Sequence, residues 1–216
     1  MTGAFFSTGV RQGDARSPGA LARILRWRKW PVQAASAEQV HGTRLQIVPA
    51  LSRPKKYHGT DGLLTEEVGQ PVAVFTADCV PVFISGDRGR VVGMLHAGWR
   101  GVQGQILPKA VRLLRRRWRI RPTAIDVWAG PSIGACCFTA GWDVARYFPS
   151  TRRRLRAAWR VDLAGELRAQ AKRLRIRWLS KKPSPGCTMH GFRHFSYRRD
   201  KTAKRQVSVI MKREES

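Results

Sequence analysis

Short apolar runs recur along the chain, and each is bounded by glycine, proline or polar residues. Runs of this kind that are rich in valine, isoleucine and phenylalanine are typical of buried strands. The predicted strands span residues 45–49, 71–78, 80–85, 90–95, 124–130 and 206–211. The runs at 71–78 and 80–85 meet at Asp78 and Cys79, and the tripeptide at 87–89 predicts a turn before the next strand.

Between these strands the apolar residues recur at helical spacing. Val102, Ile106, Ala110 and Leu114 predict one amphipathic helix from residue 102 to about 117. Further helices are predicted over 20–30, 143–148 and 163–174, and residues 52–62 and 130–137 predict loops. The interleaved elements predict an α/β (α+β) fold, with one domain over residues 1–216 built on mixed sheets. Its first 30 residues are weakly patterned, and residues 212–216 are expected to be a frayed tail.

The composition fits one substantial core and a chain that does not enter a membrane. Hydrophobic residues make up 43% of 216 residues, and no apolar run approaches the roughly 20 residues of a membrane span. The opening segment lacks the basic and apolar regions of a secretory signal. We therefore expect a cytoplasmic protein.

The net charge of +27 is extreme and comes mainly from arginines, as in residues 112–122 and 151–160. It has two interpretations, an electrostatic surface for nucleic acid or a solvated helix surface rich in arginine. We favour the second, because the arginines are spread over many segments and no nucleic-acid motif accompanies them. We expect no specific nucleic-acid partner, but a field this positive should attract anions such as phosphate.

Three residues at predicted strand ends have side chains that bind borderline metals. His41 and His96 are each followed within two residues by a glycine, Gly42 and Gly98, and Cys79 lies between two apolar runs. Two imidazoles and one thiolate make a plausible set of three zinc ligands, which leaves a fourth position for water or substrate. The spacing of these residues does not by itself enforce a site. The other cysteines form no CxxC pair, so we expect free thiols, with Cys136 and Cys137 packing beside a turn.

Several motifs resemble those of one known family. QVHGTRL, DGLLT, FTADCVPVFIS, VVGMLHAGWRGVQGQIL, WAGPSIGACC and a closing SYRRD segment occur in the order found in the laccase-domain or polyphenol-oxidase-like proteins. These are also called zinc-dependent purine nucleoside phosphorylases and peptidoglycan editing factors. The resemblance implies a monomer with a sandwich of mixed sheets, similar to the fold of certain cysteine hydrolases. It places the family's metal and catalytic residues on His41, Cys79 and His96.

The resemblance also implies a reaction. Family members act on purine nucleosides and phosphate, by phosphorolysis of adenosine, inosine, guanosine and methylthioadenosine and by deamination of adenosine. Arginine forks bind phosphate well, and aromatic rings stack on purines. We therefore predict seven substrate-binding residues inside the motifs, of which Asp78 could equally orient a ligand histidine or end a strand. The seven are Arg44, Asp78, Trp99, Arg100, Tyr197, Arg198 and Arg199.

Two other enzyme classes stay open at this stage. Copper could occupy a site of two histidines and a cysteine, with Met94 or Met189 as a weak axial ligand, which would suit a polyphenol oxidase; a multicopper oxidase, however, needs many more than five histidines. Alternatively Cys79 could be the nucleophile of a hydrolase acting on cell-wall precursors. The chain also departs from the family pattern, because Phe138 and Thr139 replace a tyrosine and a glutamate.

Overall fold

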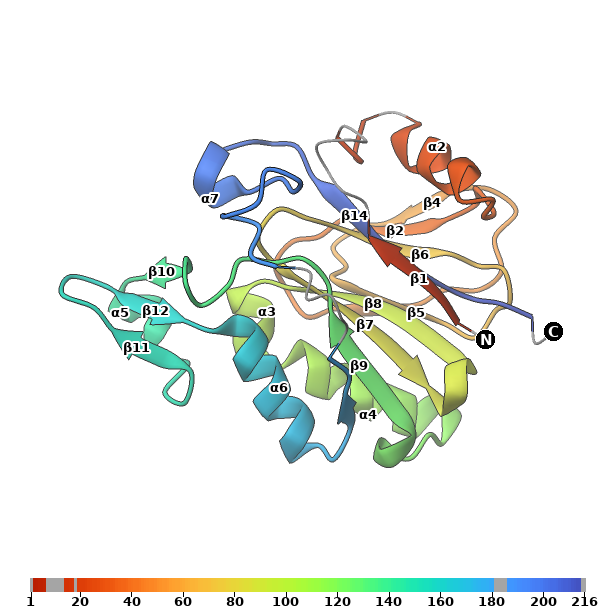
Figure 1. Ribbon diagram of the computed structural model, residues 1–216. Helices are drawn as coiled ribbons and strands as arrows, with labels where there is room; N and C mark the ends of the chain where they lie inside the picture. The colour runs from red at the N-terminus through yellow and green to blue at the C-terminus, as the bar shows by residue number, and fades with distance from the viewer. Residues whose placement is uncertain (1, 7–13, 18, 181–185, 215–216) are drawn as a thin grey trace.

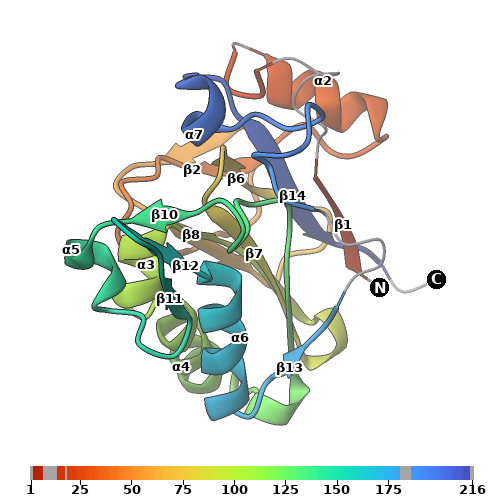
Figure 2. The same ribbon diagram turned by 60° about the vertical axis from the view of Figure 1, so that its left-hand side comes forward.

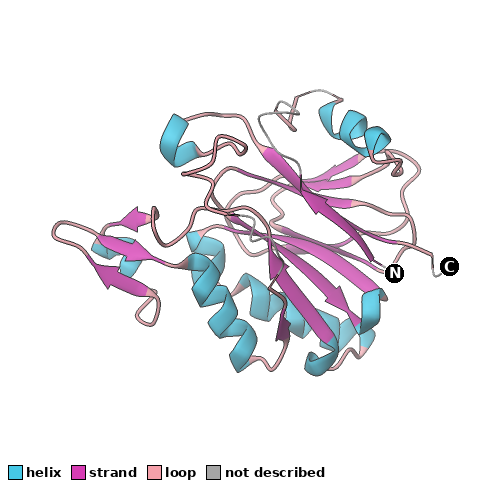
Figure 3. Ribbon diagram, viewed as in Figure 1, coloured by secondary structure: helices cyan, strands magenta, loops and turns pink. Residues whose placement is uncertain are grey.

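The computed structural model describes residues 2–6, 14–17, 19–180 and 186–214, and its strands form two large mixed sheets that pack face to face (Figures 1 and 3). The five-stranded sheet has the order β1 (Thr2–Phe6), β14 (Gln206–Lys212), β6 (Val72–Thr76), β2 (Ala35–Ala37) and β4 (Lys55–Tyr57). The six-stranded sheet has the order β13 (Arg177–Trp178), β9 (Ile125–Ala129), β7 (Val80–Gly86), β8 (Val91–Ala97), β5 (Gly62–Thr65) and β3 (Leu45–Ile47).

Helices cover the outer faces of both sheets. On the six-stranded sheet lie α3 (Trp99–Gln103), α4 (Ile106–Trp118) and α6 (Leu163–Arg173), whereas α2 (Ala20–Trp27) covers the five-stranded sheet (Figure 1). A small sheet of β10 (Thr139–Ala140), β12 (Trp159–Val161) and β11 (Arg152–Arg154) projects to one side with α5 (Trp142–Ala145), as the turned view of Figure 2 also shows. The short helix α7 (Tyr197–Asp200) precedes β14, and two 3₁₀ turns span Asp87–Gly89 and Pro122–Ala124.

Alternation along the strands builds this sandwich. In β6, Val72 and Val74 point into the apolar layer between the sheets, where they join Phe83 of β7, while Ala73 points to the layer under α2. Leu95 of β8 points the other way, into the layer beneath α4 and α6. The central strands β7 and β8 are buried on both faces, which explains why their sequences are continuous apolar runs.

The six predicted strands and the helices at 20–27 and 163–173 are confirmed, and so is the mixed α/β fold. The single helix predicted from residue 102 is wrong. The helical pattern runs through a break at Gly104 and Gln105, where Gln105 has a φ of 64°, so that α3 ends and α4 begins. The helix predicted over 143–148 is only the four-residue α5.

The two ends of the chain are more ordered than expected. In the weakly patterned first 30 residues, β1 pairs with β14, and Lys212, which we assigned to a frayed tail, is the last residue of β14. The polar segment 52–62, predicted as a loop, contains β4 and the first residue of β5. A polar edge strand of three residues such as β4 gives no periodic signal strong enough to identify it. No helix among the described residues is long and apolar enough to cross a membrane.

Candidate metal centre

Strand register brings Cys79 and His96 together at one end of the sandwich. β7 and β8 are antiparallel, with Pro81 opposite His96 and Val80 opposite Ala97. Cys79 directly precedes β7 and therefore lies beside the C-terminal end of β8. The predicted strand ended at residue 95, but β8 continues to Ala97. His96 is therefore buried within the strand and does not lie in the loop that follows it.

The carboxylate of Asp61 fixes both histidines. It accepts hydrogen bonds from the backbone N–H groups of His41 (3.0 Å) and Gly42 (2.8 Å), and a longer one from Val40 (3.3 Å). The same carboxylate lies 2.8 Å from Nδ1 of His96. Asp61 precedes β5, whose Gly62 pairs with Leu95 of β8, so sheet register places it next to His96. His41 has a φ of 60°, an uncommon conformation that these bonds to Asp61 hold in place.

One nitrogen or sulfur atom of each of His41, Cys79 and His96 lies within 4.8 Å of the others. The two imidazole rings meet edge to face, with 4.8 Å between their centroids. Gly98 makes this close approach possible, because a Cβ there would lie 3.0 Å from Cys79 Sγ and 3.2 Å from His41 Cδ2. The glycine that follows the histidine strand therefore leaves room for the thiol and the second ring.

The three groups are strongly coupled electrostatically. Burial alone would raise the pKa of Cys79, but the charge of His96 and hydrogen bonds with both histidines outweigh it and lower that pKa to about 6. Burial alone would lower the pKa of His96, but the Cys79 thiolate and the Asp61 carboxylate raise it to about 9. The thiolate is therefore the stable form of Cys79 at neutral pH, and thiolate is the form that binds metals.

The donor set fits a zinc ion. Asp61 engages Nδ1 of His96, which leaves Nε2 for a metal, and a carboxylate behind a ligand histidine is the usual support of zinc sites. Three protein ligands of borderline and soft character leave one coordination position open. Met94 is fully buried in the layer between the sheets, and neither Met94 nor Met189 lines the adjacent cavity.

The centre lies on the wall of a cavity of about 840 Å³ that opens between the ends of the two sheets. His41, Cys79 and His96 all line it. A cavity of this size is within the range that holds small-molecule ligands. The other lining residues include four aromatic residues and three arginines, namely Phe75, Trp99, Phe138, Tyr197, Arg16, Arg198 and Arg205.

Comparisons with known proteins identify the family. Residues 6–213 match the family described as multi-copper polyphenol oxidoreductase laccase. The chain belongs to this laccase family. A crystal structure of YlmD from Geobacillus stearothermophilus superimposes with a TM-score of 0.83 at 30% identity, covering 98% of this chain and 89% of that one.

Two relatives in the laccase family are named purine nucleoside phosphorylases. YlmD of Geobacillus stearothermophilus is 36% identical over 146 residues, which are 63% of this chain and 53% of that protein, so the aligned part spans about half the length of the relative. SCO2081 of Streptomyces coelicolor is 30% identical over 187 residues, covering 83% of this chain and 75% of that protein.

The motifs shared with the laccase family contain seven residues that we predicted to bind substrate, and the structure places four of them on the cavity wall. These four are Asp78, Trp99, Tyr197 and Arg198. Arg44, Arg100 and Arg199 do not line it. Arg44 is exposed, and the guanidinium of Arg100 lies 4.4 Å from the centroid of the Trp99 ring.

The guanidinium of Arg199 is hydrogen-bonded to backbone carbonyl oxygens. It donates hydrogen bonds to the carbonyl oxygens of Thr188, Gly191 and His194, and it forms an ion pair with Asp200. Arg199 therefore shapes the loop before α7 instead of facing a ligand. Motif membership alone could not distinguish it from Arg198, whose side chain reaches the cavity.

Asp78 has a different role from the histidine support that we considered. Its carboxylate accepts hydrogen bonds from Thr188 Oγ1 (2.6 Å) and from the backbone N–H of Arg198 (2.7 Å). Asp61 supports the histidine instead. The DGLLT motif quoted for the family resemblance contains Asp61, but its position before a strand gave no indication that it faces His96.

Two arginines of the cavity, Arg16 and Arg205, were not among the predicted substrate-binding residues, although Arg205 ends the closing segment that resembles the family. Asp14 accepts hydrogen bonds from the backbone N–H groups of both Arg16 (3.1 Å) and Arg205 (2.9 Å), which draws the N-terminal segment onto the chain before β14. Burial lowers the pKa of Arg205, while the nearby charges of Cys79 and Asp78 act against that shift. Its positive charge is thus close to the metal-ligand group.

Proposed function

We propose that this chain is a zinc-dependent purine nucleoside phosphorylase in which His41, Cys79 and His96 hold the metal. The observation that carries the proposal is the convergence of these three side chains on a cavity that is also lined by arginines and aromatic rings. The names of the relatives support the same reaction class. When bound, the zinc would supply Lewis-acid polarisation of a reacting oxygen.

The arginines of the cavity are suited to binding phosphate. Arg16, Arg198 and Arg205 all line the cavity, and guanidinium groups recognise phosphate bidentately. The Arg198 side chain is held in place by hydrogen bonds from Nη1 to the carbonyl oxygen and Oγ1 of Thr139, at 2.8 and 2.9 Å. Thr139, a departure from the family pattern, thus positions the arginine through a neutral oxygen and leaves its charge available to an anion.

The aromatic residues supply a surface for the base. Tyr197 is half-exposed and Trp99 partly buried where they line the cavity, and the Trp99 ring is braced by Tyr147 at 6.4 Å between centroids. The planar faces of such rings suit a purine, and the apolar lining excludes water from the reacting atoms.

The reaction follows from holding these two substrates together. A phosphate oxygen forms a bond to C1′ of the ribose as the bond from C1′ to the purine nitrogen breaks. The purine leaves with the bonding electrons and takes up one proton, which gives the free base and ribose 1-phosphate. Positive charge builds on the ribose in the transition state, so the anion held by the arginines stabilises it electrostatically.

We propose adenosine, inosine, guanosine and methylthioadenosine as substrates, and deamination of adenosine as a second reaction of the same cavity. In deamination a water oxygen adds to C6 of adenine and ammonia leaves, so that inosine forms without phosphate. The two reactions share the base-binding surface, but only phosphorolysis needs the arginines to hold a phosphate.

The test is an incubation of purified protein with adenosine, with and without phosphate, followed by separation of adenine, inosine and hypoxanthine. Adenine that appears only with phosphate supports phosphorolysis, and inosine in both conditions supports deamination. Cys79→Ser should lose the zinc of this centre and activity together, whereas Cys137→Ser, outside the cavity, should keep the zinc of this centre. Absence of every product from the zinc-loaded protein would exclude the proposed function. Turnover that survives a strong chelator but is abolished by alkylation of Cys79 would indicate a cysteine hydrolase instead.

A further inference from the structure

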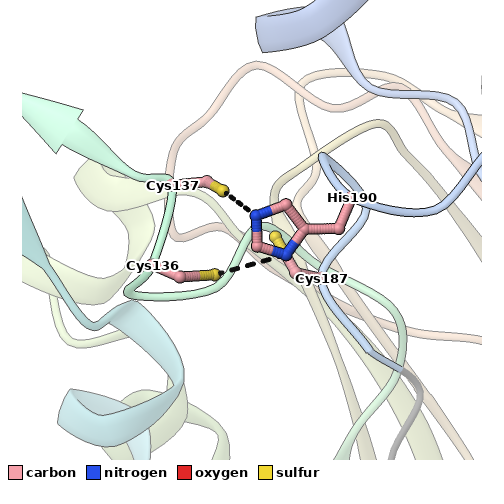
Figure 4. Close-up of side chains that lie close together, drawn as sticks. All are labelled: Cys136, Cys137, Cys187 and His190. Carbon is pink, nitrogen blue, oxygen red and sulfur yellow. Dashed lines mark hydrogen bonds between the residues drawn. The ribbon is translucent and has the colours of Figure 1, made fainter.

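A second group of soft ligands lies outside the cavity, between two loops that are far apart in sequence. Cys136 and Cys137 follow β9, and Cys187 and His190 belong to the segment before α7 (Figure 4). One ligand atom from each of the four lies within 4.8 Å of the others. Cys137 Sγ is 3.0 Å from His190 Nε2. The interpretation of Cys136 and Cys137 as packing residues is therefore wrong, because both face His190.

The backbone of the two loops is built around these sulfur atoms. Ser132 and Cys187 form a parallel bridge, in which the N–H of Thr188 donates to the carbonyl of Ser132 at 3.0 Å. The N–H of Gly134 donates to Cys187 Sγ at 3.2 Å. A Cβ on Gly134 would lie 3.1 Å from Cys136 Sγ and 3.4 Å from Cys187 Cβ, so a glycine at this position leaves room for the sulfurs to converge.

The thiols of the cluster influence one another's ionisation. Burial, together with the neighbouring thiols of Cys136 and Cys187, raises the pKa of Cys137 to about 12, because thiolates so close together repel each other. Hydrogen bonds from the N–H groups of Gly134 and Met189 act in the opposite direction on Cys187 and outweigh its burial, so that its pKa is lowered.

We propose that Cys136, Cys137, Cys187 and His190 bind one zinc ion in a closed structural site. Three cysteines and one histidine are a common structural zinc set, in which all four tetrahedral positions are taken by protein. With zinc–sulfur bonds of about 2.3 Å, the edge of such a tetrahedron is about 3.8 Å, so ligand atoms within 4.8 Å need to move by only about 1 Å. Four ligands distinguish this site from the three-ligand centre of the cavity, and its assignment does not depend on the proposed function.

The site would fasten one wall of the cavity. Thr188, next to Cys187, donates to the carboxylate of Asp78, and the N–H of Ile133 donates to the carbonyl of the same residue at 2.9 Å. Asp78 directly precedes Cys79, and Phe138, which lines the cavity, directly follows Cys137. A metal that joins the two loops would therefore hold together the chain segments that position Asp78.

The test measures zinc and cobalt binding to the full-length protein kept reduced. We expect two equivalents of zinc in the wild type, one in Cys79→Ser, one in Cys137→Ser and none in the double variant. Cobalt bound to Cys79→Ser should show an intense charge-transfer band from three thiolates and the visible bands of tetrahedral coordination. Added to Cys79→Ser, His190→Ala should weaken these visible bands. As a single change, His190→Ala should leave the cavity metal in place.

This design keeps the proposal falsifiable even where a variant is poorly folded. Cys79→Ser leaves every residue of the second site intact, so failure of this variant to bind cobalt, while its circular dichroism matches the wild type, would overturn the proposal. A second equivalent of zinc that persists in Cys137→Ser would also overturn it. A disulfide joining two of the three cysteines in freshly purified protein, detected as a mass 2 Da lower than the reduced chain, would show that the cluster is an oxidised link and not a metal site.

Discussion

Asp61→Asn removes the charge that organises the cavity centre while keeping the shape of the side chain. Asp61 is fully buried, and its two oxygens receive donors on both sides. Oδ1 faces the N–H of His41 and Nδ1 of His96, and Oδ2 faces the N–H groups of Val40 and Gly42. An asparagine has one oxygen and one NH₂ group. On one of these two sides, the NH₂ group would therefore face hydrogen-bond donors and could not accept from them.

Neither orientation of the amide is satisfactory. If the NH₂ group faces Gly42, two backbone N–H groups lose their acceptor. If it faces His96, the N–H of His41 loses its acceptor, and Nδ1 of His96 can pair only by giving up its proton. The one proton left on the ring would then be on Nε2, which is the nitrogen that a metal needs.

The magnitude follows from the number of bonds lost. Hydrogen bonds to a charged group contribute about 1.5–3 kcal/mol each, and an unsatisfied buried donor costs about 1–3 kcal/mol. With at least one side of the carboxylate lost, we expect Asp61→Asn to lower the free energy of unfolding of the metal-free protein by about 3–5 kcal/mol. Loss of the histidine support should weaken zinc binding by about 10–100-fold.

The assay is urea unfolding of the metal-free protein, together with zinc competition against a chelator of known affinity. Asp126→Asn is the matched control, because Asp126 pairs with Arg177 at the surface, and its loss should cost at most about 1 kcal/mol and leave zinc affinity unchanged. Zinc affinity of Asp61→Asn within twofold of the wild type, in folded protein, would refute the view that Asp61 holds both histidines.

Three further changes test other parts of the structure. Gly98→Ala places a methyl group 3.0 Å from Cys79 Sγ, so we expect weaker zinc binding in the same competition assay, with little loss of stability. Gly191→Ala is the control, because its nearest atom would be 3.9 Å away, and it should leave the zinc affinity of the cavity centre unchanged. Arg205→Met should raise the KM for phosphate about tenfold, equivalent to about 1.4 kcal/mol, and more than the KM for the nucleoside, whereas Arg154→Met on the projecting sheet should change neither. Phe83→Ala removes a buried ring that stacks on Trp128 at 5.2 Å, and we expect urea unfolding to show a loss of about 3–5 kcal/mol; a loss below 1 kcal/mol would contradict its place between the sheets.

The apolar strands were predictable because both large sheets are covered on both faces. Residues 80–86 and 91–97 are buried at every position, so their sequence is apolar without alternation and easily recognised. The edge strand β4 is two lysines and a tyrosine, and the projecting β11 is three arginines; neither has a buried position, and their sequences resemble loops. The break between α3 and α4 was invisible for a different reason. Ile106 continues the apolar pattern of Val102 after Gln105 has already turned the chain.

The two groups of metal ligands differ in what a sequence can reveal about them. The cavity centre joins three segments that each carry a recognisable motif, so His41, Cys79 and His96 could be selected before their distances were known. What the motifs did not contain was the register that sets Gly62 opposite Leu95 and thereby brings Asp61 to His96. The Cys136–Cys137–Cys187–His190 group depends wholly on such long-range contact, since its two halves are 50 residues apart or more. A pair of adjacent cysteines beside a glycine turn is typical of packing. Only the bridge between Ser132 and Cys187 shows that the turn faces a third thiol and an imidazole.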